Sequence, residues 1–71
     1  MPLIQVKVIE GVFDEPEKAA IIEKVTDAMV SIEGEAMRPV TWVTVEEVPS
    51  GALGIGGKPV HTGEVLGMRR A

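Results

Sequence analysis

The sequence predicts an α/β (α+β) fold in which two parallel strands and the helix between them form a β-α-β unit, followed by a short C-terminal hairpin. Three observations predict it: an alternating β-branched stretch at residues 3–9, a capped helical stretch at residues 14–33, and a second β-favouring stretch at residues 40–48. Strands joined through a helix at such lengths normally run parallel, with the helix on one face of the sheet. Since no linker, repeat or low-complexity segment interrupts it, the chain is predicted to form one domain, residues 1–71.

The first strand is predicted at residues 3–9 because Ile4, Val6 and Val8 alternate with polar side chains, which is the period of a half-buried strand. Pro2 stands directly before this strand, although proline can donate no backbone hydrogen bond to a sheet.

The helix is predicted at residues 14–33. Asp14 and Glu17 have the spacing of a capping box, and Pro16 lies in the first turn, where proline is tolerated. Aliphatic residues then recur at helical spacing, and Gly34 is a natural stop just past the end.

The second strand is predicted at residues 40–48, where every residue except Glu46 and Glu47 favours strands. The remaining residues hold six of the eight glycines and two of the five prolines. We therefore expect turns and short extended pieces there rather than a helix, with a small hairpin that reaches another subunit.

The size of the chain predicts self-association. A chain of 71 residues forms a core that rarely contributes more than ~3–5 kcal/mol, and with no cysteine and one histidine neither disulfides nor a transition metal can reinforce it. A sheet of two strands also leaves two open edges and one bare face. The missing strands are therefore expected from a partner chain, which makes the protein a homo-oligomer.

Charge and hydropathy exclude other partners. The formal net charge of −4 argues against nucleic acid, because phosphate backbones are bound by clustered lysine and arginine. No leader pattern opens the chain and no apolar run approaches the ~20 residues of a membrane span, so we expect a cytoplasmic protein.

The late glycines fit neither a Walker nor a dinucleotide phosphate loop, because Pro59 stands where each pattern needs another residue. His61 lies in a turn-rich segment without a carboxylate or serine at a suggestive spacing, so a surface histidine is the favoured interpretation. Glu46 and Glu47, adjacent on a strand, point to opposite faces. No metal site and no cofactor are predicted.

Trp42 is expected on the face of the second strand opposite the helix, where packing and lining a pocket are both open alternatives. The cations not committed to the helix or first strand are the candidates for holding an anionic substrate. These uncommitted cations are Arg38, Lys58, Arg69 and Arg70.

Pro2 offers the most unusual chemistry. If Met1 is removed, Pro2 carries a free secondary amine, and a terminal amine titrates near ~7.7–8.0, lower in an apolar site, so it can be a neutral base near pH 7. The plainer alternative is that proline at this position merely permits removal of Met1.

Three pieces of sequence, the opening "PLIQVKVIEG", "DEPEK" and the late "GIGG", occur in one order over nearly the whole chain. Together they resemble the 4-oxalocrotonate tautomerase family. The resemblance implies β-α-β protomers paired into dimers with a four-stranded sheet, and three dimers in a homohexamer. It also implies Pro2 as general base or acid in keto–enol proton transfer on a small enol-pyruvate or hydroxydienoate acid, without a cofactor.

Departures from that family bear on the substrate. Members that act on dicarboxylates carry arginines where this chain has Val12 and Trp42, and an aromatic residue where it has Leu53. The resemblance therefore implies a more apolar pocket, which Trp42 and Leu53 are predicted to shape. Carboxylate binding would then fall to Arg38, Arg69, Arg70 or residues of a neighbouring subunit, and Arg38 is the predicted anion contact.

Two other functions stay open at this point. In a hydratase or dehalogenase of unsaturated acids, protonated Pro2 would be the acid and Glu46 or Glu47 would activate water. Alternatively, the chain is a non-catalytic oligomeric relative of the fold, which retention of Met1 would support.

Overall fold

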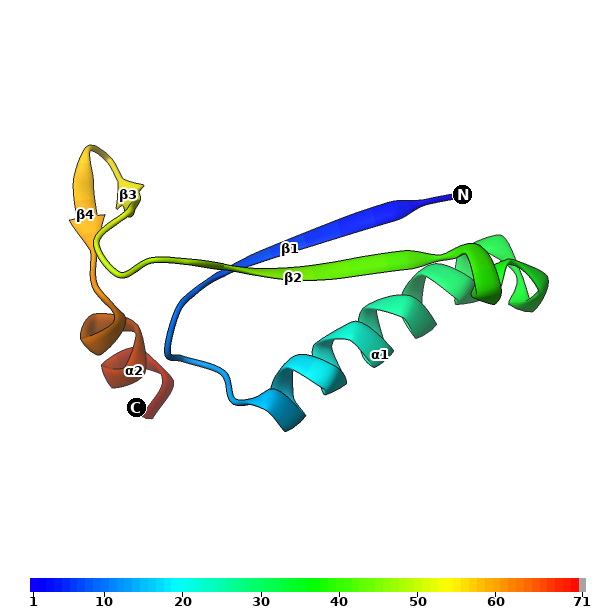
Figure 1. Cartoon of the computed structure of the whole chain (residues 1–71), viewed down its shortest axis with the longest axis horizontal. Coiled ribbons are helices and arrows are strands. Elements are labelled where there is room, and N and C mark those ends of the chain that lie inside the picture. Colours follow the sequence, from blue (N-terminus) through cyan, green and yellow to red (C-terminus); the bar gives the residue numbers. More distant parts are fainter. Residues whose placement is uncertain (71) are drawn as a thin grey trace.

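Two parallel strands form the body of the protomer, in a computed structural model that describes residues 1–70. β1 (Leu3–Ile9) pairs with β2 (Trp42–Val48) in a register that runs from Leu3 opposite Trp42 to Ile9 opposite Val48. α1 (Glu15–Glu33) connects them and lies along one side of the pair (Figure 1). The predicted β-α-β unit with parallel strands is confirmed.

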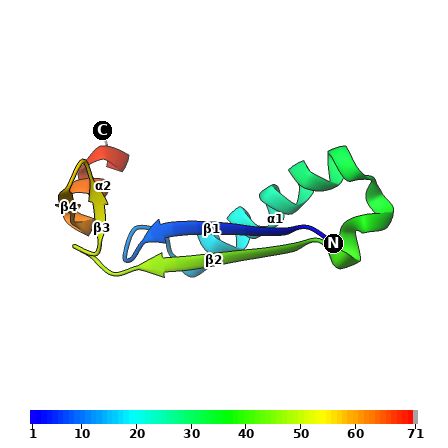
Figure 2. The same ribbon diagram turned by 90° about the horizontal axis from the view of Figure 1, so that it is seen from above.

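The sheet has one covered face and one bare face. Alternate residues of β1, namely Ile4, Val6 and Val8, are half-buried on the side of α1. Leu3, Gln5 and Lys7 on the other face are exposed, whereas Ile9 at the end of the strand is buried. On the other face Leu3 and Trp42 are 56% and 55% exposed. In Figure 2, seen from above, β1 and β2 lie side by side with α1 along them.

The helix begins as its sequence predicts. The Asp14 side chain accepts a hydrogen bond from the Glu17 backbone N–H (2.9 Å), and the Glu17 carboxylate accepts one from the Asp14 N–H (3.1 Å). This reciprocal capping satisfies two backbone donors that the first turn leaves without partners. The helix ends before Gly34, whose φ of 106° is a conformation that side chains with a Cβ rarely adopt.

The second strand starts two residues later than predicted. Residues expected to be a plain connection and the start of the strand form a short 3₁₀ helix, η1 (Glu35–Val40). Pro39 sits inside it with its φ set by the ring, and the Thr41 N–H donates to the Arg38 carbonyl (3.2 Å). Val40 is therefore held in the turn, and pairing with β1 begins only at Trp42.

The predicted C-terminal hairpin is confirmed. β3 (Leu53–Ile55) and β4 (Lys58–Val60) run antiparallel, joined by Gly56 and Gly57. These two glycines have φ values of 59° and 82°, and positive φ at both central residues is what a two-residue type I′ turn requires.

The expectation that no helix follows is wrong. α2 (Thr62–Arg70) occupies the stretch whose glycines, Gly63 and Gly67, predicted turns. Its start is tied by Glu64, whose N–H donates to the His61 carbonyl (3.0 Å) and whose carboxylate accepts from the His61 N–H (3.3 Å). Glycine lowers helix propensity by only about 1 kcal/mol, which tertiary contacts can offset.

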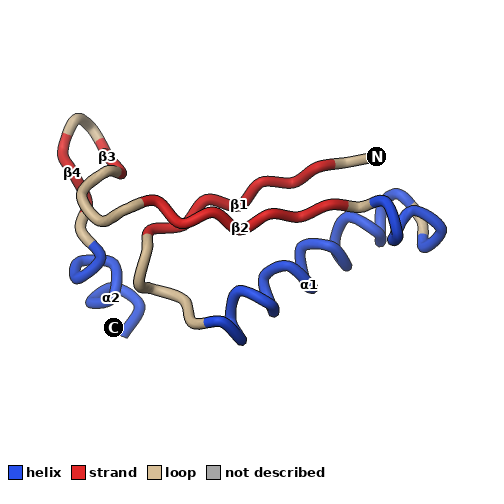
Figure 3. The backbone as a smooth tube through the Cα atoms, viewed as in Figure 1, coloured by secondary structure: helices blue, strands red, loops and turns tan. Residues whose placement is uncertain are grey.

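The hairpin and α2 lie together beyond the carboxyl ends of β1 and β2, so the protomer is elongated, 42 × 24 × 18 Å (Figure 1, Figure 3). The side chains that are buried within residues 1–70 are few: Ile9, Val12 and Val30. No helix in this part of the chain is long and apolar enough to cross a membrane.

Candidate functional site

Pro2 lies at the start of β1, at one end of the molecule. Its carbonyl accepts a hydrogen bond from the Trp42 backbone N–H (3.0 Å), which aligns the first residues of both strands. Its nitrogen has no hydrogen to contribute to the ladder, so a proline here costs the sheet nothing. With Met1 attached that nitrogen belongs to an amide, and Met1 itself is 77% exposed.

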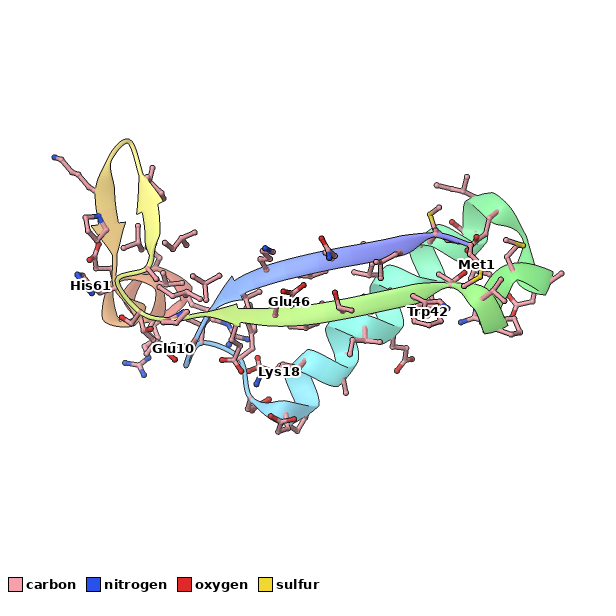
Figure 4. The ribbon with its side chains drawn as sticks, turned by 45° about the horizontal axis from the view of Figure 1, so that its top comes forward. Met1, Glu10, Lys18, Trp42, Glu46 and His61 are labelled. Carbon is pink, nitrogen blue, oxygen red and sulfur yellow. The ribbon has the colours of Figure 1, made fainter. Side chains whose placement is uncertain are left out.

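Trp42 lies at the same end, and Figure 4 shows it close to Met1. Its side chain is on the sheet face opposite α1, as predicted, and more than half of it is exposed. The structure therefore brings Pro2 and Trp42 together beside a bare apolar surface that also includes Leu3.

Arg38, in η1, is occupied by carboxylates of its own chain. Its Nε donates to Glu35 (2.7 Å) and its Nη1 donates to Asp27 (2.8 Å). The hydrogen bond that Arg38 donates to Glu35, followed by the one that it donates to Asp27, raises the pKa of Arg38 above its ordinary value. Its assignment as the anion contact stays a prediction, and any substrate carboxylate would compete with these partners.

Leu53 lies at the other end of the molecule, in the hairpin. It borders an apolar hollow of about 490 Å³ between the carboxyl end of β1, the hairpin and α2. The residues that line it are Val8, Ile9, Val12, Phe13, Leu53, Val65, Met68 and Arg69. We call this space the hairpin hollow. Val12, where the resemblance has an arginine, is 6% exposed and forms part of its wall.

The predicted site residues are therefore divided between two ends. β1 has 7 residues, which at ~3.3 Å each span about 20 Å. Within one protomer the structure joins Pro2 to Trp42 but holds both away from Leu53.

Arg69 organises the second end. The sequence offers it as one of four uncommitted cations, but does not reveal its contacts with Val12, Phe13 and Glu17. Its Nη1 donates to the Val12 carbonyl (2.9 Å) and to Glu17 Oε1 (3.1 Å), and its Nη2 donates to Glu17 Oε2. Its guanidinium lies 4.7 Å from the centre of the Phe13 ring, a cation–π contact. The sequence held one weak signal for the helix that carries Arg69. Acidic Glu64 and basic Arg69 stand near the two ends of the segment, as is favourable in a helix, but its glycines predicted turns.

The pKa of Glu17 reflects this contact. The hydrogen bond from Arg69, and then the one from the Asp14 N–H, lower the pKa of this carboxyl to about 2. Glu17 thus joins the start of α1 to α2 as an anion at all ordinary pH values.

The paired glutamates of β2 do point to opposite faces. Glu47 turns toward α1, where it binds Lys18 and accepts from the Gly11 N–H (3.3 Å), and these contacts, Lys18 first, lower its pKa. Glu46 lies on the bare face and is exposed. His61 is exposed beside Gly51, and among residues 1–70 no three histidine, aspartate or glutamate side chains cluster as metal ligands would.

Comparisons with known proteins agree with this architecture. A family model described as "Tautomerase enzyme" matches residues 2–63. A 2-hydroxymuconate tautomerase from Pseudomonas putida is 44% identical over 57 residues, which are 80% of this chain and 87% of that protein.

Two solved structures are also similar. One of the 4-oxalocrotonate tautomerase isozymes from Methylibium petroleiphilum has a TM-score of 0.72 and 37% identity, with 82% of this chain and 90% of that chain covered. TomN, a 4-oxalocrotonate tautomerase homologue in the tomaymycin biosynthetic pathway, has a TM-score of 0.74 and 32% identity, with 97% and 94% covered.

Proposed function

The chain belongs to the tautomerase enzyme family, and on this premise we propose that it interconverts the keto and enol forms of a small unsaturated acid, with the amine of Pro2 as general base and acid. The observation that carries the proposal is the place of Pro2. It stands at the free end of β1, one residue from the start of the chain, beside the apolar side chains of Leu3 and Trp42.

Removal of Met1 would convert the Pro2 nitrogen from an amide into a secondary amine. An apolar environment disfavours the charged form of an amine, so its pKa falls from ~7.7–8.0 toward neutrality. A base whose pKa lies near the working pH transfers protons most effectively. Trp42 and Leu3, more than half exposed in the single chain, would supply such an environment once a further copy of the chain covers them.

In the ketonisation direction, the neutral amine accepts the proton of the enol hydroxyl. The oxygen electron pair then forms the carbonyl, and the former C=C electron pair takes a proton from the ammonium at carbon. One proton leaves oxygen and one arrives at carbon, so neither oxidant nor cofactor is required.

The complete site would need two copies of the chain. A two-fold axis that joins the free edges of two β1 strands makes them antiparallel. The Pro2 of one copy then lies beside the carboxyl end of β1 in the other, where that copy's Leu53 and Val12 line the hairpin hollow. Such a dimer has the four-stranded sheet that the resemblance implies. Association of three dimers into a hexamer would cover the exposed Leu3 and Trp42.

The substrate follows from the residues that line the two ends. The relative from Pseudomonas putida is named for 2-hydroxymuconate. In this chain Val12 and Trp42 stand where the resemblance has arginines, so we propose a substrate with fewer charges and a larger apolar part.

The test is ketonisation of phenylenolpyruvate, an aryl enol-pyruvate, by protein whose intact mass shows loss of Met1. A variant with extra residues before Pro2 keeps every side chain but makes the Pro2 nitrogen an amide. We expect this variant and Pro2→Ala to lose about 10²–10⁴-fold in rate, the usual size of general acid–base catalysis. Full activity in the extended variant, with unchanged solution size, would show that Pro2 is not the base.

A further inference from the structure

We propose that Arg69 binds the carboxylate of the substrate and that the hairpin hollow beside it takes an apolar alkyl or aryl chain, so that the preferred substrate is an apolar monocarboxylate. The inference rests on the proposed function for the reaction itself, but it concerns a different part of the molecule. Arg69 also lies beyond residues 2–63, which the family model matches.

The first argument is the geometry of the guanidinium. The edge formed by Nη1 and Nη2 faces Glu17, and the second hydrogen of Nη1 points to the Val12 carbonyl. The other edge, formed by Nε and the second N–H of Nη2, donates to no residue in the part of the chain that the structure describes. Such an edge presents two parallel donors, the arrangement that binds a carboxylate through both oxygens.

The second argument is that this guanidinium is held in place before any ligand arrives. Glu17, the Val12 carbonyl and the Phe13 ring fix it from three directions. A cation whose rotamer is already fixed loses little entropy when it binds an anion. α2 lies beside the loop that follows β1 (Figure 1), and the hydrogen bond from Arg69 to the Val12 carbonyl places the guanidinium at this loop.

The third argument is the composition of the hollow. Among the described residues that line the hairpin hollow, Arg69 alone is charged, and the rest are aliphatic, aromatic or methionine side chains. Met68 and Leu53 stand at its rim, 67% and 38% exposed. An anionic group that enters this space has one cationic partner in the chain, while an attached hydrocarbon displaces water from Val12, Leu53 and Met68.

The carboxylate of Glu17 limits how many substrate carboxylates Arg69 can bind. Glu17 and Lys24 border a second hollow of about 370 Å³ that shares Phe13 and Arg69 with the first. Because Glu17 already neutralises one edge of the guanidinium, Arg69 can accept one further carboxylate but not two. The site therefore suits a monocarboxylate and is poorly suited to a dicarboxylate.

The test separates binding from turnover. Trans-cinnamate is an unsaturated monocarboxylate with an aryl group, and cinnamamide has the same shape without the charge. Calorimetric titration of the wild-type protein should show that cinnamate binds more tightly than cinnamamide. In Arg69→Gln we expect cinnamate to bind about 10- to 100-fold more weakly, as loss of a hydrogen bond to a charged group predicts, with cinnamamide unchanged.

Three variants serve as controls. Arg70→Gln removes a neighbouring charge of the same helix and should leave both affinities unchanged. Arg69→Lys keeps the charge without the paired donors and should lie between wild type and Arg69→Gln. Glu17→Gln removes the charge of the ion pair but keeps the guanidinium, which the Val12 carbonyl and the Phe13 ring still hold, so it should retain most of the cinnamate affinity. If Glu17→Gln loses as much cinnamate affinity as Arg69→Gln, the loss in both variants comes only from poorer docking of α2, and the inference is overturned.

The two proposals fail separately. If the protein ketonises phenylenolpyruvate but Arg69→Gln binds cinnamate as tightly as wild type, the role of Arg69 is wrong and that of Pro2 stands. If cinnamate binding depends on Arg69 but no enol is turned over, the carboxylate site stands and the proposed reaction is wrong. If the wild type binds cinnamate no better than cinnamamide, no carboxylate site exists at Arg69.

Discussion

The two ends of the protomer are built in different ways. At the Pro2 end Trp42 meets Pro2 through the strand ladder and its side chain remains exposed, while side-chain contacts such as that of Arg38 with Glu35 join residues close in sequence. At the α2 end the contacts are made by side chains distant in sequence, since Arg69 reaches Val12 and Glu17 across more than fifty residues. The first end carries the proposed catalytic proline, and the second carries the proposed binding surface. The difference suggests that each end supplies half of a site that two copies complete.

The largest effect should come from mixing two defective proteins. We expect the variant extended before Pro2 to be inactive because it has no amine, and Leu53→Glu to be inactive because it puts a charge into the hairpin hollow. When the two are unfolded together and refolded at equal amounts, half of the dimers should contain both chains, and one of the two sites in each should be intact. Activity should return to about a quarter of the wild-type value.

The control for this experiment is each variant refolded alone, which should stay inactive. If the mixture is no more active than its components while size measurements show mixed oligomers, each site lies within one chain and the two ends do not cooperate.

An intermediate effect is expected from Asp14→Ala, which removes the cap of α1 at the α2 end. Loss of an N-cap side chain costs about 1 kcal/mol of unfolding free energy, measurable by urea denaturation at fixed protein concentration. Glu17 takes part in both the capping and the Arg69 contact, so hydrogen exchange of α2 should also become faster. Glu23→Ala, an exposed change further along α1, should alter stability by less than ~0.5 kcal/mol. Equal losses in the two variants would contradict the role of the cap.

The smallest effect should be the acid response of the contact between Glu17 and Arg69. The pKa of Glu17 is lowered from 4.5 to about 2 by Arg69, so its stabilising contribution is complete above pH 4.5 and is lost as the pH falls toward 2. Because these groups are solvent-accessible, the gain is small and screened by salt. The protection factors of the α2 amides, which correct for the intrinsic pH dependence of exchange, should fall in this range, and Glu17→Gln should abolish that change. Trp42 fluorescence, which reports on the other end, should not follow the same titration.

Much of the fold could be predicted because it depends on local signals. The alternation of Ile4, Val6 and Val8 and the pairing of Asp14 with Glu17 are visible within a few residues of sequence. The Gly56–Gly57 turn of the hairpin is equally visible in the local sequence. α2 was missed because its stability depends on Arg69 contacts with a distant loop, which outweigh the low helix propensity of Gly63 and Gly67.

The candidate site likewise has parts that depend on local sequence and parts that depend on contacts between distant residues. The sequence by itself determined the chemistry that we propose: a proline at position two, which removal of Met1 would turn into a terminal amine, a β-α-β unit to carry it, and no cysteine. Only the tertiary structure decided where the cations go. It pairs Arg38 with Glu35 and Asp27, and it carries Arg69 into an apolar hollow with one edge of its guanidinium free of described partners. The physical reason is that a side chain's charge is set by its own covalent structure, whereas its partners are set by residues that only folding brings within hydrogen-bonding distance.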